Sequence, residues 1–163
     1  KTTKVQTPLA VSKAEVLRDQ PVIALVLRAG LAMHVGFLEV FDNADSCFIS
    51  AYRDEGSKEK IKAHIEYLAS PNLEGRTVIL VDPMLATGSS LVGGYAALLK
   101  NGSPKKLHVA CLVAAPEGIT ELQEKMPEMD TLWVAAIDSH LNEHAYIVPG
   151  LGDAGDLAFG EKI

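Results

Sequence analysis

A glycine and three residues with hydroxyl side chains lie at one junction between an expected strand and an expected helix. The apolar run Thr77–Val81 predicts a buried strand, which Pro83 ends because proline cannot donate to the ladder. Residues 87–90 (TGSS) then lead into an amphipathic run at 91–100 that predicts a helix. At such a junction, backbone N–H groups and the positive end of the helix dipole converge on an anion. The sequence therefore predicts a phosphate site, with Asp82 placed to accept hydrogen bonds from sugar hydroxyls.

A simpler interpretation of residues 87–90 is that they only cap the helix that follows them. The segment is not a P-loop, because no Gly-Lys-Ser or Gly-Lys-Thr follows the glycine. The fragment alone does not decide between a cap and a phosphate site, so the choice depends on the other motifs.

Two arginines, Arg28 and Arg53, each follow an apolar segment that predicts a strand, at 21–27 and at 45–52. In open α/β sheets, ligands bind at the carboxyl ends of the strands. A guanidinium matches phosphate oxygens with two parallel hydrogen bonds. The pair therefore predicts a clamp for a diphosphate, although Arg28 could instead be a surface arginine that pairs with an acidic side chain.

Apolar runs alternate with helical patterns along most of the chain. Runs without a polar face are typical of strands covered on both sides, as in a parallel sheet. The predicted fold class is α/β, with an open, mostly parallel sheet flanked by helices on both faces. Strands are expected at 21–27, 45–52, 77–81, 106–115 and 131–137. Helices are expected at 91–100, at 119–125 and after Gly30, the last with its apolar pattern at Leu31, Val35, Leu38 and Phe41.

Four segments lie outside this alternation. Residues 1–10 predict a strand in an arm or at an edge, and residues 12–19 predict a short helical turn or a loop. The charged residues 56–62 predict a mobile loop that shields a reacting centre from water and leads into a β-arm at 64–68. The glycine-rich segment 142–160 is too apolar for a floppy tail and predicts a binding loop.

The composition is that of a globular protein of one domain and limits its partners. The 163 residues are 48% hydrophobic and carry a net charge of −6, which argues against a nucleic-acid-binding protein because phosphate neutralisation needs clustered Lys and Arg. Cys47 and Cys111 lie in apolar runs and are expected to be buried free thiols. No signal peptide or membrane-spanning run is present, so a cytoplasmic enzyme is expected.

Three motifs together resemble the uracil phosphoribosyltransferases, which have the type I phosphoribosyltransferase fold. They are VDPMLATGS at 81–89, the Arg-Ala-Gly turn at 28–30, where members often hold a cis peptide bond without proline, and YIVPGLGDAGD at 146–156. The resemblance extends from about residue 21 to residue 163. Ser89 stands where the family usually has glycine, but it keeps the backbone N–H. The helical stretch that members normally carry at the amino terminus is missing from this sequence.

The resemblance implies a pentosyltransferase of pyrimidine salvage. It would join uracil to 5-phospho-α-D-ribose 1-diphosphate (PRPP) and release uridine monophosphate (UMP) and diphosphate. It implies one domain over residues 1–163, with a core at about 21–137, a base-recognition hood at about 138–163 and a β-arm. Mg²⁺ is expected, bound mainly through the diphosphate and not in a metal site of the protein. A homodimer or higher homo-oligomer is also expected, and GTP is left open as an effector.

The resemblance also assigns the site residues. Arg28 and Arg53 would bind the diphosphate and Asp82 the ribose hydroxyls, and these three are the expected catalytic residues. PRPP is expected to contact Arg28, Arg53, Asp82, Pro83, Met84, Leu85, Ala86, Thr87, Gly88, Ser89, Ser90 and Asp153. Uracil is expected to contact Ile147, Gly152, Asp153 and Ala154, largely through backbone carbonyl and N–H groups that match its planar edge.

Three other functions fit less well. A nucleotide-sensing, RNA-binding regulator with the same fold would need a basic face, whereas this chain is acidic and keeps the hood motif. A purine transferase usually has two adjacent acids in the central loop, whereas Pro83 occupies the second position here. A scaffolding role would leave both glycine-rich motifs unexplained.

Overall fold

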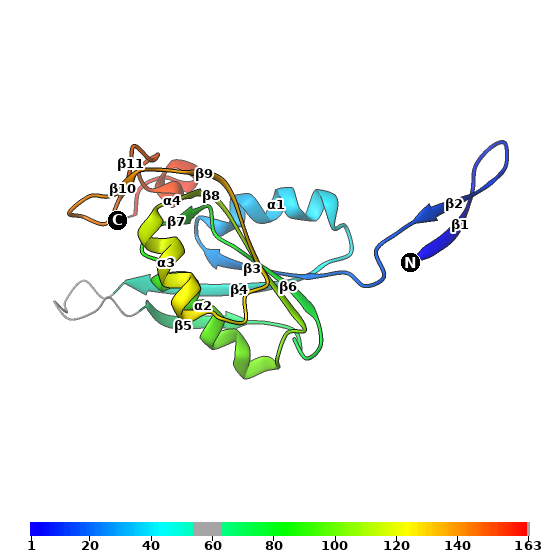
Figure 1. Cartoon of the computed structure of the whole chain (residues 1–163), viewed down its shortest axis with the longest axis horizontal. Coiled ribbons are helices and arrows are strands. Elements are labelled where there is room, and N and C mark those ends of the chain that lie inside the picture. Colours follow the sequence, from blue (N-terminus) through cyan, green and yellow to red (C-terminus); the bar gives the residue numbers. More distant parts are fainter. Residues whose placement is uncertain (54–62, 163) are drawn as a thin grey trace.

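An open, mostly parallel sheet forms the centre of the molecule (Figure 1). The structure is a computed structural model, which describes residues 1–53 and 63–162. The strand order is β5-β4-β3-β6-β8, with β9 beside β8 and the short β7 paired with the end of β8. All these pairs are parallel except β4 with β5, which confirms the predicted fold class. The strands are β3 (Val22–Leu27), β4 (Asp45–Arg53), β5 (Ala63–Ala69), β6 (Thr77–Val81), β7 (Met84–Leu85), β8 (Lys106–Ala114) and β9 (Thr131–Ile137).

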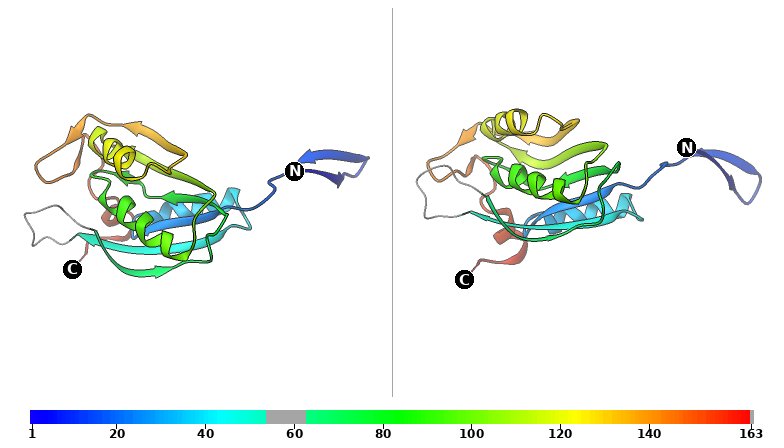
Figure 2. Two further views of the ribbon diagram at one scale, coloured as in Figure 1. Left: turned by 60° about the horizontal axis from the view of Figure 1, so that its bottom comes forward. Right: turned by 90° about the horizontal axis from the view of Figure 1, so that it is seen from below.

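Helices cover both faces of the sheet (Figure 2), so β3 is buried on both sides. Val22, Ala24 and Val26 pack in one core cluster with residues of α2 and α3. Ile23 and Leu25 point the other way and pack against α1. The helices are α1 (Gly30–Val40), α2 (Ser89–Leu98), the 3-10 turn η1 (Leu99–Asn101) and α3 (Pro116–Lys125). None of the helices in residues 1–53 and 63–162 has the length and apolar character needed to cross a bilayer.

Two of the four apolar residues in the predicted pattern of α1, Leu31 and Val35, do not face the sheet. Leu31 and Val35 are 37% and 57% exposed, whereas the side chains packed on the sheet include Met33 and Phe37 together with Phe41. The helix is apolar almost all round, so its pattern does not single out one face. The prediction for Cys47 and Cys111 is confirmed, since both are buried free thiols.

The first residues form a hairpin arm that projects away from the sheet (Figure 1). Strand β1 (Thr2–Gln6) pairs antiparallel with β2 (Val11–Glu15). The strand expected within residues 1–10 is confirmed. The helical turn or loop expected at 12–19 is wrong for residues 12–15, which complete the hairpin ladder, whereas residues 16–19 form a loop. The strand expected at 64–68 is confirmed as β5, an edge of the main sheet, and the loop predicted at 56–62 lies outside the described residues.

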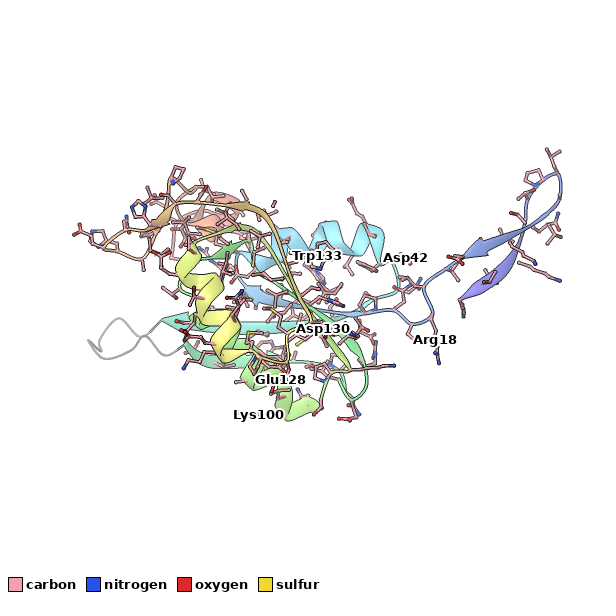
Figure 3. All side chains as sticks on the ribbon, in the orientation of Figure 1. Arg18, Asp42, Lys100, Glu128, Asp130 and Trp133 are labelled. Atoms are coloured by element: carbon pink, nitrogen blue, oxygen red, sulfur yellow. The ribbon has the colours of Figure 1, made fainter. Side chains whose placement is uncertain are left out.

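The outer strands leave one apolar face open. Leu132 and Val134 of β9 pack against the core shared with α2 and α3. Trp133 and Ile137, which alternate with them, are 65% and 63% exposed (Figure 3). Helix α1 contacts mainly β3 and β6, so it does not extend over this part of the sheet.

A histidine is buried where α1 meets the start of β4. His34 is 6% exposed, its Nε2 lies 2.8 Å from the hydroxyl oxygen of Ser46, and its ring is tilted against Phe48. Burial lowers the pKa of His34 below its usual value of 6.5. The folded protein therefore holds this imidazole in its neutral form at pH values where the unfolded chain is already protonated.

We expect the protein to lose stability as the pH falls below about 6.5, because the unfolded state then binds a proton at residue 34 that the folded state does not. The change to make is His34→Gln, which keeps a polar side chain near Ser46 but cannot titrate. Urea unfolding of both proteins at about pH 7.5 and pH 5.5 measures the effect. The wild type should lose more stability than the variant between these pH values, and parallel losses would contradict the assignment.

Candidate active site

The carboxyl ends of three neighbouring strands bring the predicted site residues to one edge of the sheet. Strand β3 pairs in parallel with both β4 and β6. Arg28 follows β3, Arg53 is the last residue of β4, and Asp82 follows β6. The peptide bond Leu27–Arg28, which leads into the Arg-Ala-Gly turn, is cis. The side chain of Arg53 lies outside the described part of the chain, so its role stays a prediction.

Asp82 lies at the break between two strands, β6 and β7, that both pair with β8. Strand β6 pairs with the first half of β8 and β7 with its end, and the break between them is Asp82-Pro83. The Asp82 side chain is 9% exposed, and its Oδ1 accepts a hydrogen bond of 3.3 Å from the backbone N–H of Met84. Burial raises the pKa of the neighbouring Cys111 thiol, and the negative charge of Asp82 raises it further. The thiol thus stays neutral, and Asp82 provides a fixed carboxylate at this edge.

Residues 86–90, called here the phosphate loop, connect β7 to α2. Gly88 is the N-cap residue of α2, with a φ of 81°, and as a glycine it offers no side chain to the first turn. The Thr87 hydroxyl accepts from the backbone N–H of Ser89 at 3.4 Å and donates to the Ser89 hydroxyl at 3.1 Å. The first N–H groups of a helix without a side-chain cap favour an anion. The arrangement therefore has the form that the sequence predicted for a phosphate site.

Helix α3 supports the phosphate loop from behind. A Cβ placed on Gly118 would lie 2.3 Å from the carbonyl oxygen of Ala86, and one on Gly88 would lie 3.2 Å from the carbonyl oxygen of Gly118. Both glycines therefore permit an approach of backbone to backbone that no other residue allows. No pattern in the sequence around Gly118 predicted this contact.

The hood lies over the carboxyl edge (Figure 1) and is fastened at several points. It contains β10 (His140–Leu141), β11 (Ile147–Val148) and α4 (Ala154–Phe159). Glu117 of α3 accepts from the backbone N–H of Leu141 at 3.0 Å, an interaction that lowers the pKa of Glu117. Asp138 accepts from the N–H of Gly150 at 2.9 Å. Ile147, a predicted uracil contact, is buried in one apolar cluster with Ala86 of the phosphate loop.

Helix α4 joins the hood to Arg28. Asp153 caps the helix by accepting from the N–H of Asp156 at 2.9 Å. Burial would raise the pKa of Asp153, but it is lowered overall because backbone N–H groups, Lys162 and Arg28 outweigh burial. Arg28 Nη2 lies 2.5 Å from Asp156 Oδ1, and Nη1 donates to the carbonyl oxygen of Gly160 at 3.2 Å. Arg28 thus pairs with an acid, as the alternative interpretation held, and this acid belongs to the hood.

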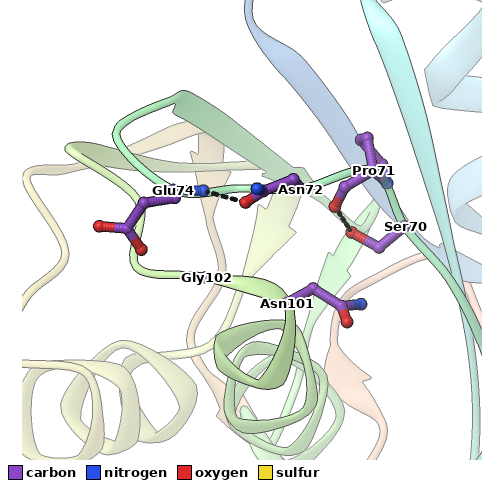
Figure 4. Close-up of a pocket in the computed structure, with 6 residues that line it drawn as sticks. All are labelled: Ser70, Pro71, Asn72, Glu74, Asn101 and Gly102. Carbon is purple, nitrogen blue, oxygen red and sulfur yellow. Dashed lines mark hydrogen bonds between the residues drawn. The ribbon is translucent and has the colours of Figure 1, made fainter.

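One hollow borders the site and another lies far from it. An apolar groove of about 840 Å³ between α1 and α4 is lined in part by Pro83 and Ala154, which were predicted to contact substrates. A polar hollow of about 510 Å³ lies at the opposite edge of the sheet, before β6 and after η1 (Figure 4). There the backbone N–H of Glu74 donates to Asn72 at 2.9 Å, and none of the predicted site residues lines the hollow.

The comparisons with known proteins agree with these features. A family model described as uracil phosphoribosyltransferase matches residues 1–161. The uracil phosphoribosyltransferase of Porphyromonas gingivalis is 48% identical over 159 residues, which are 98% of this chain and 74% of the relative. That of Pyrococcus furiosus is 43% identical, over 98% of this chain and 69% of the relative.

Solved structures show the same fold. A protein from Aquifex aeolicus superposes with a TM-score of 0.87 at 35% identity, over 100% of this chain and 76% of that one. A purine phosphoribosyltransferase from Pyrococcus horikoshii superposes with a TM-score of 0.54 at 22% identity, over 72% of this chain and 76% of that one. The second likeness, at its lower identity, concerns the fold alone.

Proposed function

The chain belongs to the uracil phosphoribosyltransferase family, and from this premise we propose that the carboxyl edge of its sheet is the active site. As a member it transfers the phosphoribosyl group of PRPP to uracil, an activity of pyrimidine salvage. One observation carries the proposal. Ile147 of the hood is buried against Ala86 of the phosphate loop, so a base held by the hood would lie beside a phosphate held by the loop. We also propose that residues 21–137 form the catalytic core and residues 138–163 the hood of one domain.

The reaction breaks the bond between C1′ of the ribose and the diphosphate, and positive charge develops on the ribose. Arg28 and Arg53 would stabilise the departing diphosphate, because guanidinium groups aimed at developing negative charge lower the barrier. Asp82 would hold the ribose hydroxyls with its carboxylate near the developing cation. The 5′-phosphate would be anchored by the phosphate loop, Ala86, Thr87, Gly88, Ser89 and Ser90. PRPP would also contact the residues before the loop, Pro83, Met84 and Leu85. Positioning of the two substrates would supply most of the rate.

The backbone of the hood would recognise uracil through hydrogen bonds. Its edge presents a carbonyl, an N–H and a second carbonyl in one plane, which backbone N–H and C=O groups can match. Ile147, Gly152, Asp153 and Ala154 would provide these groups, with Asp153 also contacting PRPP. Cytosine has an amino donor where uracil has the C4 carbonyl and an acceptor where uracil has the N3–H, so this swap would leave buried polar groups unpaired, which is a strong basis for rejection.

The carboxylates of Asp82 and Asp153 fit Mg²⁺, because carboxylate oxygens are ligands that this ion prefers. Within residues 1–53 and 63–162, no group of three or more His, Cys, Asp or Glu side chains could hold a metal. The diphosphate would therefore supply most of the ligands. When bound, Mg²⁺ neutralises charge on the diphosphate.

The open apolar face supports a homo-oligomer. Leu112, Trp133 and Ile137 are 45%, 65% and 63% exposed, and exposed apolar patches are typical of protein interfaces. We propose that a second copy of the chain covers this face, and the molar mass by light scattering tests it. An effect of GTP and a cytoplasmic location stay predictions, of which the first is tested by adding GTP to the assay described next.

The activity is tested by mixing the purified protein with Mg²⁺, PRPP and labelled uracil, with cytosine, hypoxanthine and orotate as parallel bases. We expect UMP from uracil and no nucleotide from the other bases. A preference for another base would contradict the role of the hood but keep that of the phosphate loop. No product with any base would point to a regulatory protein that binds nucleotides without this reaction.

A further inference from the structure

We propose that Asp156 is a positioning residue, which holds the guanidinium of Arg28 in place for the diphosphate. The inference rests on the proposed function, since it concerns the substrate that Arg28 would bind. Asp156 is not among the residues expected to contact PRPP or uracil. It would act on the reaction only through Arg28.

The contact joins two parts of the chain that are far apart in sequence. Arg28 Nη2 lies 2.5 Å from Asp156 Oδ1 across a separation of 128 residues, and the side chains are 37% and 34% exposed. Nη1 of the same guanidinium donates to Gly160 at the other end of α4. Both ends of this short helix therefore hold the one arginine.

Gly155 lies where the backbone of α4 approaches the guanidinium of Arg28. A Cβ at Gly155 would lie 3.1 Å from Asp153 Oδ1 and 3.6 Å from Arg28 Nη2. Asp153 stands on the same turn and caps it. The helix thus brings a proposed PRPP contact, Asp153, and the holder of the diphosphate arginine, Asp156, into one rigid turn.

Arg28 has donors left for a ligand while it is held. A guanidinium presents its N–H groups in a planar fork, and the two contacts to α4 use one group each on Nη1 and Nη2. Its Nε is buried and has no hydrogen-bond partner among the described residues, so the donors left for a ligand are the second N–H groups on Nη1 and Nη2. An arginine that is free to rotate loses much rotamer entropy when it binds an anion, so holding it in advance strengthens binding.

The first experiment measures kcat and the KM values for PRPP and uracil, and also the Kd of diphosphate with Mg²⁺ by calorimetry. We expect Asp156→Ala to raise the KM for PRPP and the Kd of diphosphate about tenfold. Asp156→Asn keeps an acceptor oxygen and the shape of the side chain, so it should cause a smaller change in the same direction. The matched control is Asp45→Ala, which removes a comparable ion pair of 2.9 Å with Arg76 at the other edge of the sheet and should leave these constants unchanged.

A second experiment separates positioning of Arg28 from a general disturbance of α4. If Asp156 acts through the guanidinium, Asp156→Ala should have little further effect on PRPP binding in an Arg28→Lys background. An equal loss in both backgrounds would overturn the proposal. A KM for PRPP that is unchanged or lower in the Asp156 variants would overturn it too, because Asp156 would then compete with the diphosphate. Should the wild type form no UMP, the proposed function fails, and the calorimetric measurement still tests Asp156 separately.

Discussion

Replacement of Asp82 by asparagine is expected to lower kcat by about two to three orders of magnitude. The change keeps the size of a side chain that is only 9% exposed, and it removes the negative charge beside the ribose. That charge matters most when the bond to diphosphate is breaking and the ribose becomes positive. The loss should therefore appear in kcat, while the KM values for PRPP and uracil change much less. Steady-state rates of UMP formation at saturating substrates measure it.

Asp130→Asn is the control for this change, because Asp130 is also an aspartate at a strand end with defined partners. Asp130 lies just before β9 (Figure 3). Lys106 Nζ is 2.5 Å from its Oδ1, and the N–H of Leu107 donates to its Oδ2 at 2.8 Å. The site is at the amino edge of the sheet, so kcat should stay near the wild-type value. A kcat for Asp82→Asn within about threefold of wild type would show that the carboxylate is not needed in the transition state.

The central strands could be predicted from the sequence because their burial makes them continuous apolar runs. Thr77–Val81 has the predicted bounds. The outer strand Thr131–Ile137 has them too, because its sequence is apolar although most of its residues are exposed. Turn-forming residues limit such runs, so both type and position are encoded locally. The exposed strand β2 (Val11–Glu15) was missed for the opposite reason. Its residues are mostly exposed, and its strand conformation comes from backbone pairing with β1, which leaves no apolar pattern.

The candidate site was predictable where a strand end fixes a position, and not where a distant contact does. Arg28 and Asp82 follow strands that are neighbours in the sheet, so their placement at one edge followed from the order of elements. The pairing of Arg28 with Asp156 depends on how the hood folds back over 128 residues. Only the second aspartate of the GDAGD string hinted at it. The close contact between Gly118 and Ala86 likewise depends on how closely α3 packs against the phosphate loop, and no local sequence pattern predicts that.

Replacement of Gly118 by alanine is expected to displace the phosphate loop. The added Cβ would lie 2.3 Å from the carbonyl oxygen of Ala86 and 2.9 Å from Leu85 Cδ1. A side chain can rotate away from such a contact, but a backbone oxygen moves only if the loop moves with it. A shift of about 1 Å would misalign the N–H groups offered to the 5′-phosphate, so kcat/KM for PRPP should fall about a hundredfold. Overpacking should also lower the free energy of unfolding by about 1–3 kcal/mol.

Gly36→Ala is the control for Gly118→Ala, because it adds a methyl group to a helix without displacing the phosphate loop. Gly36 lies within α1, and a Cβ there would meet nothing within 4 Å. Alanine favours helix more than glycine by about 1 kcal/mol, so this variant should be as stable as the wild type or more so. If Gly118→Ala unfolds at a lower temperature yet keeps its kcat/KM for PRPP, α3 supports the fold but does not position the loop. If PRPP binding is lost while uracil binding and most of the stability remain, the contact between α3 and Ala86 sets the geometry of the phosphate site.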